Sequence, residues 1–415
     1  MTASARLVAV DATRGIALLG MMAVHVLPES DANGQSTWSF LIFGGRAAAA
    51  FAVLAGATVA FMTGRRRVTR AAAMSTVAAL ATRALAVGAI GLALGYADAA
   101  LAAVILPYYA VLFLLAIPLV FLPSWAVALV GVIAMTGFPA LTHVLIPELP
   151  VPTLLNPTLS YLVHQPVALL SELSVTGEYP ALTWLTYLCA GLVVGRMNLA
   201  RLRTALGLLT AGAALALAAW FVSWALLNHF GGLAQIWAAQ PDSVLTESET
   251  TDLLALGGDG TTPASTWWWL AVDAPHTGSP PDLMGTTGTA IAMLGGLLAL
   301  THLRQPVLRR AVRVVQAPLA AAGGMTLTLY TAHIMFINSD YDTYDSATSY
   351  LLQVAAVLLI GLGWRASAGR GPLEALVSAL TGRARRAASR NAGSDTPTPA
   401  SAARPVPDDT RGLSP

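Results

Sequence analysis

Long apolar runs separated by short polar breaks recur along the whole chain of 415 residues. A helix of about 20 apolar residues spans the hydrocarbon core of a bilayer, and about ten runs of this kind can be placed. They lie at about 7–27, 39–62, 72–96, 101–122, 124–146, 180–196, 204–228, 283–302, 318–338 and 347–364. The pattern therefore predicts an all-α, polytopic membrane protein with about ten transmembrane helices.

The composition agrees with this interpretation. Hydrophobic residues make up 56% of the chain and charged residues only 11%, about half the charged share of a soluble domain. A soluble core could not bury that much apolar surface, so the bilayer is the expected partner.

The basic residues predict the orientation, because cytoplasmic loops near helix ends collect lysine and arginine. The chain has no lysine, and its 23 arginines are clustered. Ten spans that start from a cytoplasmic N-terminus put every cluster on the cytoplasmic side, and most acidic residues fall on the other side. Both termini are therefore predicted to be cytoplasmic, and nothing indicates nucleic-acid binding. The clusters are Arg65, Arg66, Arg67 and Arg70; Arg196, Arg201 and Arg203; Arg304, Arg309, Arg310 and Arg313; and the set from Arg365 to Arg390.

Three parts of the chain differ in character. Residues 1–365 form the predicted membrane domain, and residues 366–390 form a basic amphipathic segment expected to lie along the inner membrane surface. Residues 391–415 are rich in Ser, Thr, Pro, Ala and Gly and predict a disordered tail. Two long outer segments, at about 147–179 and 229–282, are predicted to roof a cavity together. The second contains Trp267–Trp269, an interfacial anchor or a carbohydrate-stacking platform.

The first apolar run carries three ionisable residues, Asp11, Arg14 and His25. Such groups are costly inside a membrane and each suggests a function. At 100° per residue all three share one helix face, and Arg14 lies about 16 Å nearer the cytoplasm than His25. This arrangement suits a ligand with an anionic head at Arg14 and a reactive end at His25. The alternative is that Asp11 and Arg14 simply neutralise each other.

Other polar residues in apolar runs are further candidates. His25 can act as a general base because imidazole titrates near neutral pH. Tyr330 and His333 are three residues apart, so both project from one face of the ninth run. Arg46 lies in the second run, where two interpretations stand equal: it pairs with an outer carboxylate, or it binds an anionic or carbonyl group of a substrate.

Several chemical signatures are missing from the sequence. We find no glycine-rich phosphate loop with a lysine, no serine-hydrolase elbow and no metal-ligand spacing of Cys and His. ATP-driven chemistry and a bound metal are therefore not expected.

Six segments carry a resemblance to a known superfamily. RLVAVDATRGIALLGMMAVH and GGRAAAAFAVLAGATVAF resemble the first two helices of the integral-membrane acyltransferases, which include acyltransferase family 3, the heparan-alpha-glucosaminide N-acetyltransferases and the bacterial YeiB-like proteins. TGEYPALTWLTYLCAGLVVGR, HTGSPPDLMGTTGTA, GMTLTLYTAH and GRGPLEAL look most like the YeiB-like branch.

The resemblance implies a multi-pass protein of the bacterial cytoplasmic membrane. It implies transfer of an acyl group, most often acetyl, from cytoplasmic acyl-CoA to a sugar or cell-envelope glycan across the bilayer. A homo-oligomer is compatible with the pattern. His25 matches the first-helix histidine of acyltransferase family 3, and Arg14 matches the arginine of that helix. The heparan-type enzymes instead carry their catalytic histidine in the loop after this helix, and residues 28–45 contain none.

These expectations combine into one hypothesis. Acyl-CoA binds at Arg14 and Asp11, and His25 either deprotonates the acceptor or carries the acyl group. Arg46 and Tyr330 then stabilise the oxyanion and His333 orients the acceptor. Two rivals remain: a transporter or lipid-linked sugar flippase, and a non-catalytic relative that acts in envelope assembly.

Overall fold

The computed structural model describes residues 3–394, and no β-strand is formed in this part of the chain. The predicted all-α, polytopic fold is confirmed. The longer helices are α1 (Ala3–Val26), α3 (Arg46–Met62), α4 (Ala73–Leu94), α6 (Ser124–Leu145), α10 (Leu202–Trp224), α13 (Pro280–Leu300), α14 (Pro306–Gly323), α16 (Ser346–Ser367) and α17 (Pro372–Ser394). The shorter ones are α2 (Trp38–Phe43), α5 (Leu106–Leu119), α7 (Leu159–His164), α8 (Pro166–Ser171), α9 (Ala181–Arg196), α11 (Gly232–Ala238), α12 (Glu247–Leu256) and α15 (Thr326–Ile337).

The number of membrane-capable helices is smaller than predicted. Within residues 3–394, seven helical segments are long and apolar enough to cross a bilayer, or eight if α14 and α15 are counted as one broken span. The seven coincide with seven of the ten predicted runs. The predicted continuous span at 318–338 is wrong, because α14 and α15 meet at an angle of 73°.

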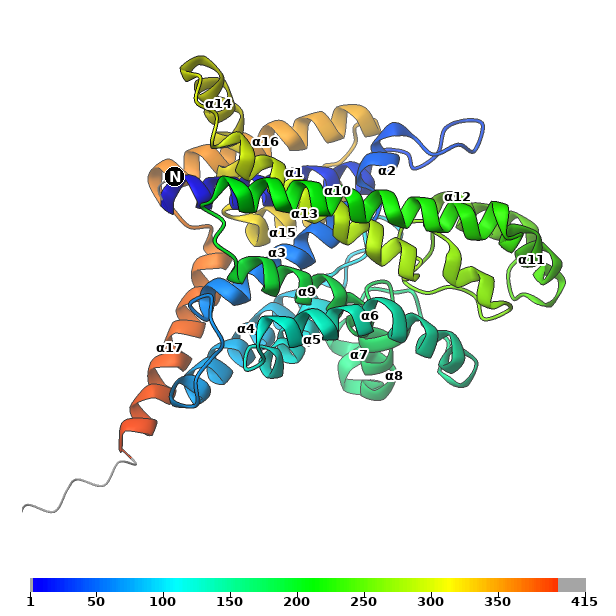
Figure 1. The fold of residues 1–415 in the computed structure, drawn as a ribbon, viewed down its shortest axis with the longest axis horizontal. Coiled ribbons are helices and arrows are strands. Elements are labelled where there is room, and N and C mark those ends of the chain that lie inside the picture. The colour runs from blue at the N-terminus through cyan, green and yellow to red at the C-terminus, as the bar shows by residue number, and fades with distance from the viewer. Residues whose placement is uncertain (1–2, 395–415) are drawn as a thin grey trace, which may run out of the picture.

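The other two predicted spans, at 101–122 and 180–196, are the short helices α5 and α9. With 14 and 16 residues, they fall short of the length that a membrane-spanning helix needs. Helix α9 runs through the middle of the bundle (Figure 1), and most of its residues are buried. Gly56 and Gly191 let α3 and α9 touch backbone to backbone. Such close packing replaces lipid contact with protein contact.

The first helix is held just as closely on its other side. Gly15 faces the backbone of Leu319, and Gly323 faces the backbone of Asp11, with no room for a Cβ atom at either glycine. Gly15 therefore serves the crossing of α1 with α14 and leaves no space there for a ligand.

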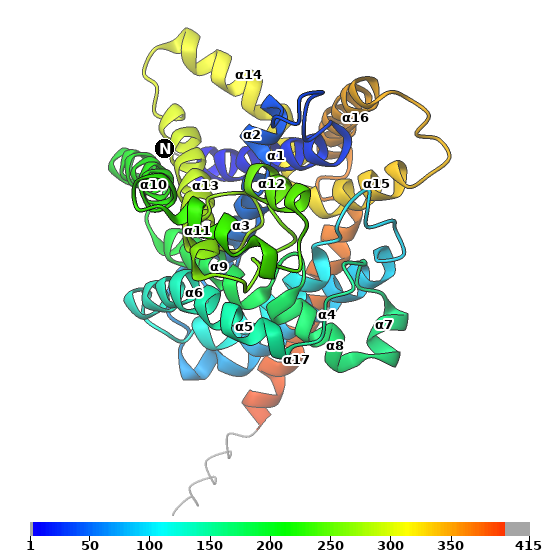
Figure 2. The same cartoon turned by 90° about the vertical axis from the view of Figure 1, so that its right-hand side faces the viewer.

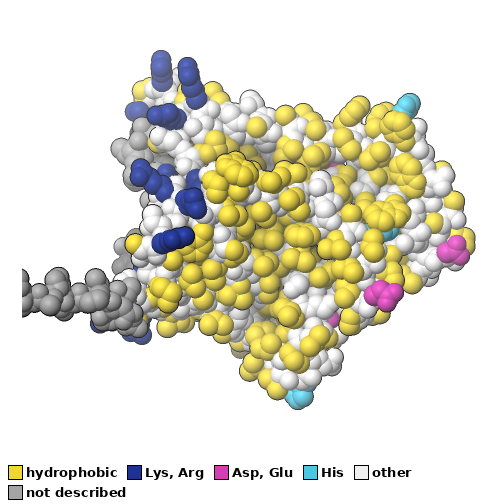
Figure 3. Space-filling model, turned by 60° about the horizontal axis from the view of Figure 1, so that its bottom comes forward, with side chains coloured by type: hydrophobic (Ala, Val, Ile, Leu, Met, Phe, Trp, Pro, Cys, Tyr) yellow, Lys and Arg dark blue, Asp and Glu magenta, His cyan; other side chains and the backbone are white. Residues whose placement is uncertain are grey.

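Charge is separated along the long axis of the molecule. Arginines gather at one end of the surface in Figure 3, acidic side chains at the other, and a broad apolar belt lies between. We call these the arginine end and the acidic end. The N-terminus lies at the arginine end (Figure 1). The predicted cytoplasmic location of that end stays a prediction.

The C-terminal helix α17 packs against α4 at the arginine end (Figure 1). Arg385 donates from Nη2 to the carbonyl of Met62 at 3.1 Å, which ties this helix to the end of α3. The helix includes residues 391–394 of the predicted tail, and the rest of that tail, 395–415, lies outside the described residues.

A roof of short helices covers the acidic end, with α11 and α12 lying over the bundle in the end-on view of Figure 2. Its small core contains Ile236, Trp269 and Val272. Of the three consecutive tryptophans, Trp269 is fully buried in this core, whereas Trp267 is 57% exposed and contacts His143 with the two ring planes tilted by 43°. The triplet therefore helps to hold the roof together.

Candidate functional site

One face of α1 lines two cavities in succession. Arg14, Met21 and His25 lie within about 40° of each other around the helix axis. Arg14 and Met21 line a cavity of about 220 Å³ toward the arginine end, called here the arginine-side cavity. Met21 and His25 line a second cavity of about 500 Å³, the acidic-side cavity. The face of α1 that was predicted to carry Arg14 and His25 therefore runs along both cavities.

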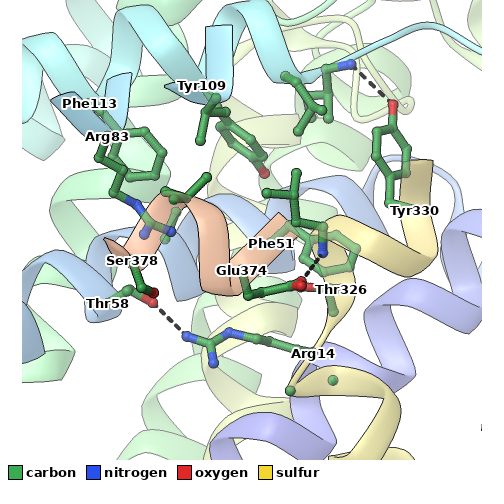
Figure 4. Close-up of a pocket in the computed structure, with 18 of the residues that line it drawn as sticks. Arg14, Phe51, Thr58, Arg83, Tyr109, Phe113, Thr326, Tyr330, Glu374 and Ser378 are labelled. Carbon is green, nitrogen blue, oxygen red and sulfur yellow. Dashed lines mark hydrogen bonds between the residues drawn. The ribbon is translucent and has the colours of Figure 1, made fainter. Parts of the chain in front are cut away.

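Two arginines point into the arginine-side cavity (Figure 4). Arg14 donates from Nη1 to Asp11 Oδ1 at 2.8 Å and from Nη2 to Thr58 Oγ1 at 2.5 Å. Arg83 of α4 stacks on the ring of Phe113 at 4.9 Å. Its Nε is buried with no hydrogen-bond partner among the described residues. A buried donor without a partner is costly, so a bound anion would satisfy this group.

Helix α17 closes the same cavity with Glu374, Val377 and Ser378. Glu374 Oε1 accepts from the backbone nitrogens of Leu327 and Thr328, at 2.6 and 3.2 Å, and Oε2 accepts from Thr328 Oγ1 at 2.6 Å. This carboxylate caps the start of α15, just beyond the bend after α14. The bend, the cavity and the C-terminal helix therefore form one structural unit.

A thin partition separates the two cavities. Met21 lines both. Tyr109 lines the arginine-side cavity and donates from its hydroxyl to the carbonyl of Ala48, which lines the other, at 3.4 Å. Methionine is flexible and unbranched, so Met21 can move aside without breaking a hydrogen bond.

His25 is held from behind by a second histidine. His25 Nδ1 and His333 Nε2 are 3.0 Å apart, and the ring planes differ by 6° with centroids 5.3 Å apart. This geometry places the bond in the plane of both rings. His333 Nδ1 in turn lies 2.6 Å from Gln353 Oε1 of α16. Because Nδ1 of His25 is occupied, Nε2 remains for the cavity.

The acidic-side cavity collects carboxyl groups around His25. Glu29, Glu178 and Asp259 all line it. Burial and, to a smaller extent, the charges of Asp259 and Glu29 together raise the pKa of Glu178 from 4.5 to about 8. Burial also raises the pKa values of Glu29 and Asp259. Further negative charge is therefore unfavourable in this cavity, which favours cationic or neutral contents.

The roof contributes His276 to this cavity. Its backbone has φ of 56°, in the left-handed region that is rare for residues other than glycine. The carbonyl of His276 accepts from Gly260 N at 2.7 Å, which joins two roof loops. Burial lowers the pKa of the imidazole to about 4, so His276 is neutral at physiological pH. As predicted, both long outer segments contribute to one cavity, through Glu178 and His276.

The structure separates the predicted site residues into two groups. Arg14 and Tyr330 line the arginine-side cavity and His25 lines the acidic-side cavity. Asp11 and His333 line neither and instead bind Arg14 and His25 from behind. His333 therefore orients His25, and its predicted role in orienting the acceptor stays a prediction.

Arg46 also lines neither cavity. Its Nη1 donates to the carbonyl of Leu41 at 2.7 Å. Burial raises the pKa of Asp273, and the positive charge of Arg46 offsets part of that rise. Of the two interpretations of Arg46, this placement favours the nearby carboxylate of Asp273, and the predicted contact with a substrate oxyanion stays a prediction.

Sequence reasoning did not select Arg83, Glu178, Asp259 or His276. Arg83 carried the same signal as Arg14, an arginine inside an apolar run. The roof residues carried no local signal, because the fold brings them to His25 from distant parts of the chain.

Among residues 3–394, no three His, Cys, Asp or Glu side chains are grouped so that they can hold a metal ion.

The sequence matches a known protein family. Residues 6–239 match the family described as "Heparan-alpha-glucosaminide N-acetyltransferase, catalytic", which covers more than half of the chain. No curated protein matches the sequence. The matched segment includes α1 with Arg14, Met21 and His25, and α4 with Arg83.

Proposed function

The chain belongs to the catalytic family of heparan-alpha-glucosaminide N-acetyltransferases, and on this premise we propose that it carries an acetyl group from acyl-CoA to a sugar across the membrane. Membership makes the protein a membrane acyltransferase. The observation that carries the proposal is the continuous α1 face, with Arg14 at one cavity, His25 at the other and Met21 between them.

The donor fits the arginine-side cavity. Coenzyme A is anionic at its nucleotide end, and Arg14 and Arg83 supply two guanidinium groups with the geometry that suits phosphate. The arginine end faces the cytoplasm in this proposal, where acyl-CoA is made. The acyl thioester then passes Met21 to reach His25.

The acceptor fits the acidic-side cavity. Its lining within residues 3–394 contains three carboxyl groups and no arginine, so a sulfated or phosphorylated sugar would be repelled. A neutral sugar or one with an amino group is the better match. The proposed acceptor is therefore an uncharged or amine-bearing part of an extracytoplasmic glycan.

The chemistry follows from the free Nε2 of His25. This nitrogen takes the proton of the attacking amine or hydroxyl as the new C–N or C–O bond forms. The C–S bond of the thioester breaks, and the proton on His25 then passes to the departing CoA thiolate. No proton is gained or lost overall.

Tyr330 is the proposed oxyanion partner. Its hydroxyl oxygen accepts from the backbone nitrogen of Ile105 at 3.4 Å, so its own proton remains free to donate into the arginine-side cavity. When the thioester carbon reaches His25, its carbonyl oxygen points back past Met21 toward the arginine-side cavity in this proposal, and a donor there stabilises the charge that develops on it.

His25 replaces the loop histidine of the heparan-type enzymes in this proposal. The loop after α1 contains no histidine between residues 28 and 45, but Glu29, Phe40 and Phe43 of this region line the cavity beside His25. The histidine and the loop therefore meet at one place. Assignment to the YeiB-like branch and to a bacterial cytoplasmic membrane stays a prediction.

Transfer across a sealed bilayer tests the proposal. Purified protein in liposomes receives radiolabelled acetyl-CoA outside and glucosamine inside, and the labelled product is measured in the lumen. We expect acetylated glucosamine in the lumen. It is formed by those protein molecules whose arginine end faces the outside of the liposome, where acetyl-CoA is present. Glucosamine flux without acetyl-CoA would instead support the transporter, and label retained on the protein without acceptor would show that His25 carries the acyl group.

A further inference from the structure

A chain of four hydrogen bonds runs from His25 to the surface at the acidic end. His25 contacts His333 at 3.0 Å, His333 contacts Gln353 at 2.6 Å, Gln353 contacts Ser349 at 2.9 Å and Ser349 contacts Asp342 at 2.7 Å. His333, Gln353 and Ser349 are buried, and Asp342 is half-buried in the loop between α15 and α16.

The last member fixes the direction of the whole chain. An ionised carboxylate only accepts hydrogen bonds, so Ser349 must donate to Asp342. The Ser349 oxygen then accepts from Gln353 Nε2, which leaves Gln353 Oε1 facing His333. An amide oxygen only accepts, so His333 Nδ1 carries a proton and its Nε2 accepts from His25 Nδ1. The free nitrogen of neutral His25 is therefore Nε2.

We propose that Asp342, Ser349 and Gln353 are positioning residues that hold His25 in the tautomer whose Nε2 lone pair is available to the acidic-side cavity. The catalytic consequence rests on the proposed function, whereas the tautomer itself follows from the hydrogen bonds alone. The proton acquired by His25 stays there until the thiolate takes it, because the Gln353 amide does not readily pass a proton onward.

The opposite direction shows why Asp342 matters. If the Gln353 amide were rotated, its NH₂ group would face His333 Nδ1, and every bond up to His25 would reverse. His25 would then carry its proton on Nε2 and could not act as a base. Rotation would also make Ser349 donate to the amide oxygen and leave Asp342 without its hydrogen bond.

The tautomer can be read without any enzyme assay. Protein labelled with ¹⁵N in the histidine rings is studied by NMR in detergent, and the His25 signals are assigned by their loss in His25→Asn. A protonated Nδ1 and an unprotonated Nε2 on neutral His25 are expected. A neutral His25 protonated on Nε2 would overturn the proposal, whether or not the protein proves to be an acyltransferase.

Substitution at the surface end tests the direction. Asp342→Asn keeps the side-chain size but can donate as well as accept, so a second His25 tautomer should appear. Asp340→Asn makes the same change of charge at an exposed residue close by and should leave the tautomer unchanged. Asp342→Glu keeps an obligate acceptor and should keep the single tautomer.

Activity gives the second measurement. For histidines that bind a metal, loss of the hydrogen bonds that orient the ring typically costs 10- to 100-fold in metal affinity or activity. A fall of about this size in kcat, with an unchanged KM for acetyl-CoA, is expected for Asp342→Asn and Ser349→Ala and not for Asp340→Asn. Wild-type kcat and an unmixed tautomer in Asp342→Asn would refute the positioning role. Since Asp342 lies at the edge of the fold, this variant tests the proposal even if Ser349→Ala fails to fold.

Discussion

Replacing Arg83 by methionine removes a half-buried positive charge from the arginine-side cavity and keeps most of the side-chain bulk. Arg83 is the better choice than Arg14, because loss of Arg14 would also leave Asp11 without its ion pair. The Arg83 Nε has no hydrogen-bond partner among the described residues. The free protein therefore loses the stacking of the guanidinium on Phe113, about 0.5–2 kcal/mol, together with the attraction between Arg83 and Glu374 across the cavity.

The expected cost to donor binding follows from one charge-assisted contact. A hydrogen bond to a charged group contributes about 1.5–3 kcal/mol, and each 1.4 kcal/mol is a factor of ten. The KM for acetyl-CoA should therefore rise roughly ten- to a hundredfold in Arg83→Met, with a smaller change in kcat. Initial rates of label transfer over a range of acetyl-CoA concentrations measure both constants.

A truncated donor separates charge recognition from a general disturbance of the site. Acetyl-pantetheine has the same thioester and no phosphate, so Arg83→Met should leave its KM within about twofold of wild type. Arg46→Met is the matched control, because Arg46 lines neither cavity. An equal loss with both donors, or an equally large effect of Arg46→Met, would refute phosphate recognition by Arg83.

Two further predictions concern the partition and the acidic-side cavity. Met21→Trp should block passage between the cavities, so that acetyl-CoA still binds while acetyl transfer is lost. Met74→Trp, at an exposed position of α4, is the control. Unimpaired transfer by Met21→Trp would exclude this route. Burial chiefly raises the pKa of Glu178 from 4.5 to about 8. The folded protein therefore keeps the Glu178 proton to a higher pH than the unfolded chain does. The stability of the wild-type protein should fall as the pH rises from about 4.5 to about 8. The thermal unfolding temperature, measured against pH, should fall less steeply in Glu178→Gln than in the wild type over this range. Parallel curves of unfolding temperature against pH for the two proteins would contradict the raised pKa.

The sequence was sufficient to predict the membrane class and the functional face of α1. Seven apolar runs correspond to long apolar helices, because bilayer thickness imposes a length that composition reveals. Helical periodicity likewise placed Arg14 and His25 on one face. Both are local properties of a continuous helix.

The missed features depend on tertiary contacts. Arg46 and Arg83 both lie in apolar runs, and only packing decides that Arg83 faces a cavity while Arg46 contacts the backbone of Leu41. The bend between α14 and α15 is stabilised by Glu374 from the distant helix α17. The positioning chain behind His25 likewise joins α1 to α15 and α16, more than 300 residues away.

The most direct test of the account is the rate at which His25→Ala transfers radiolabelled acetyl from acetyl-CoA to glucosamine. General-base catalysis typically contributes 10²- to 10⁴-fold, so a loss of about that size is expected, with acetyl-CoA binding retained. His164→Ala, at an exposed histidine outside both cavities, should keep the wild-type rate. Transfer by His25→Ala at the wild-type rate would contradict the central role assigned to this residue.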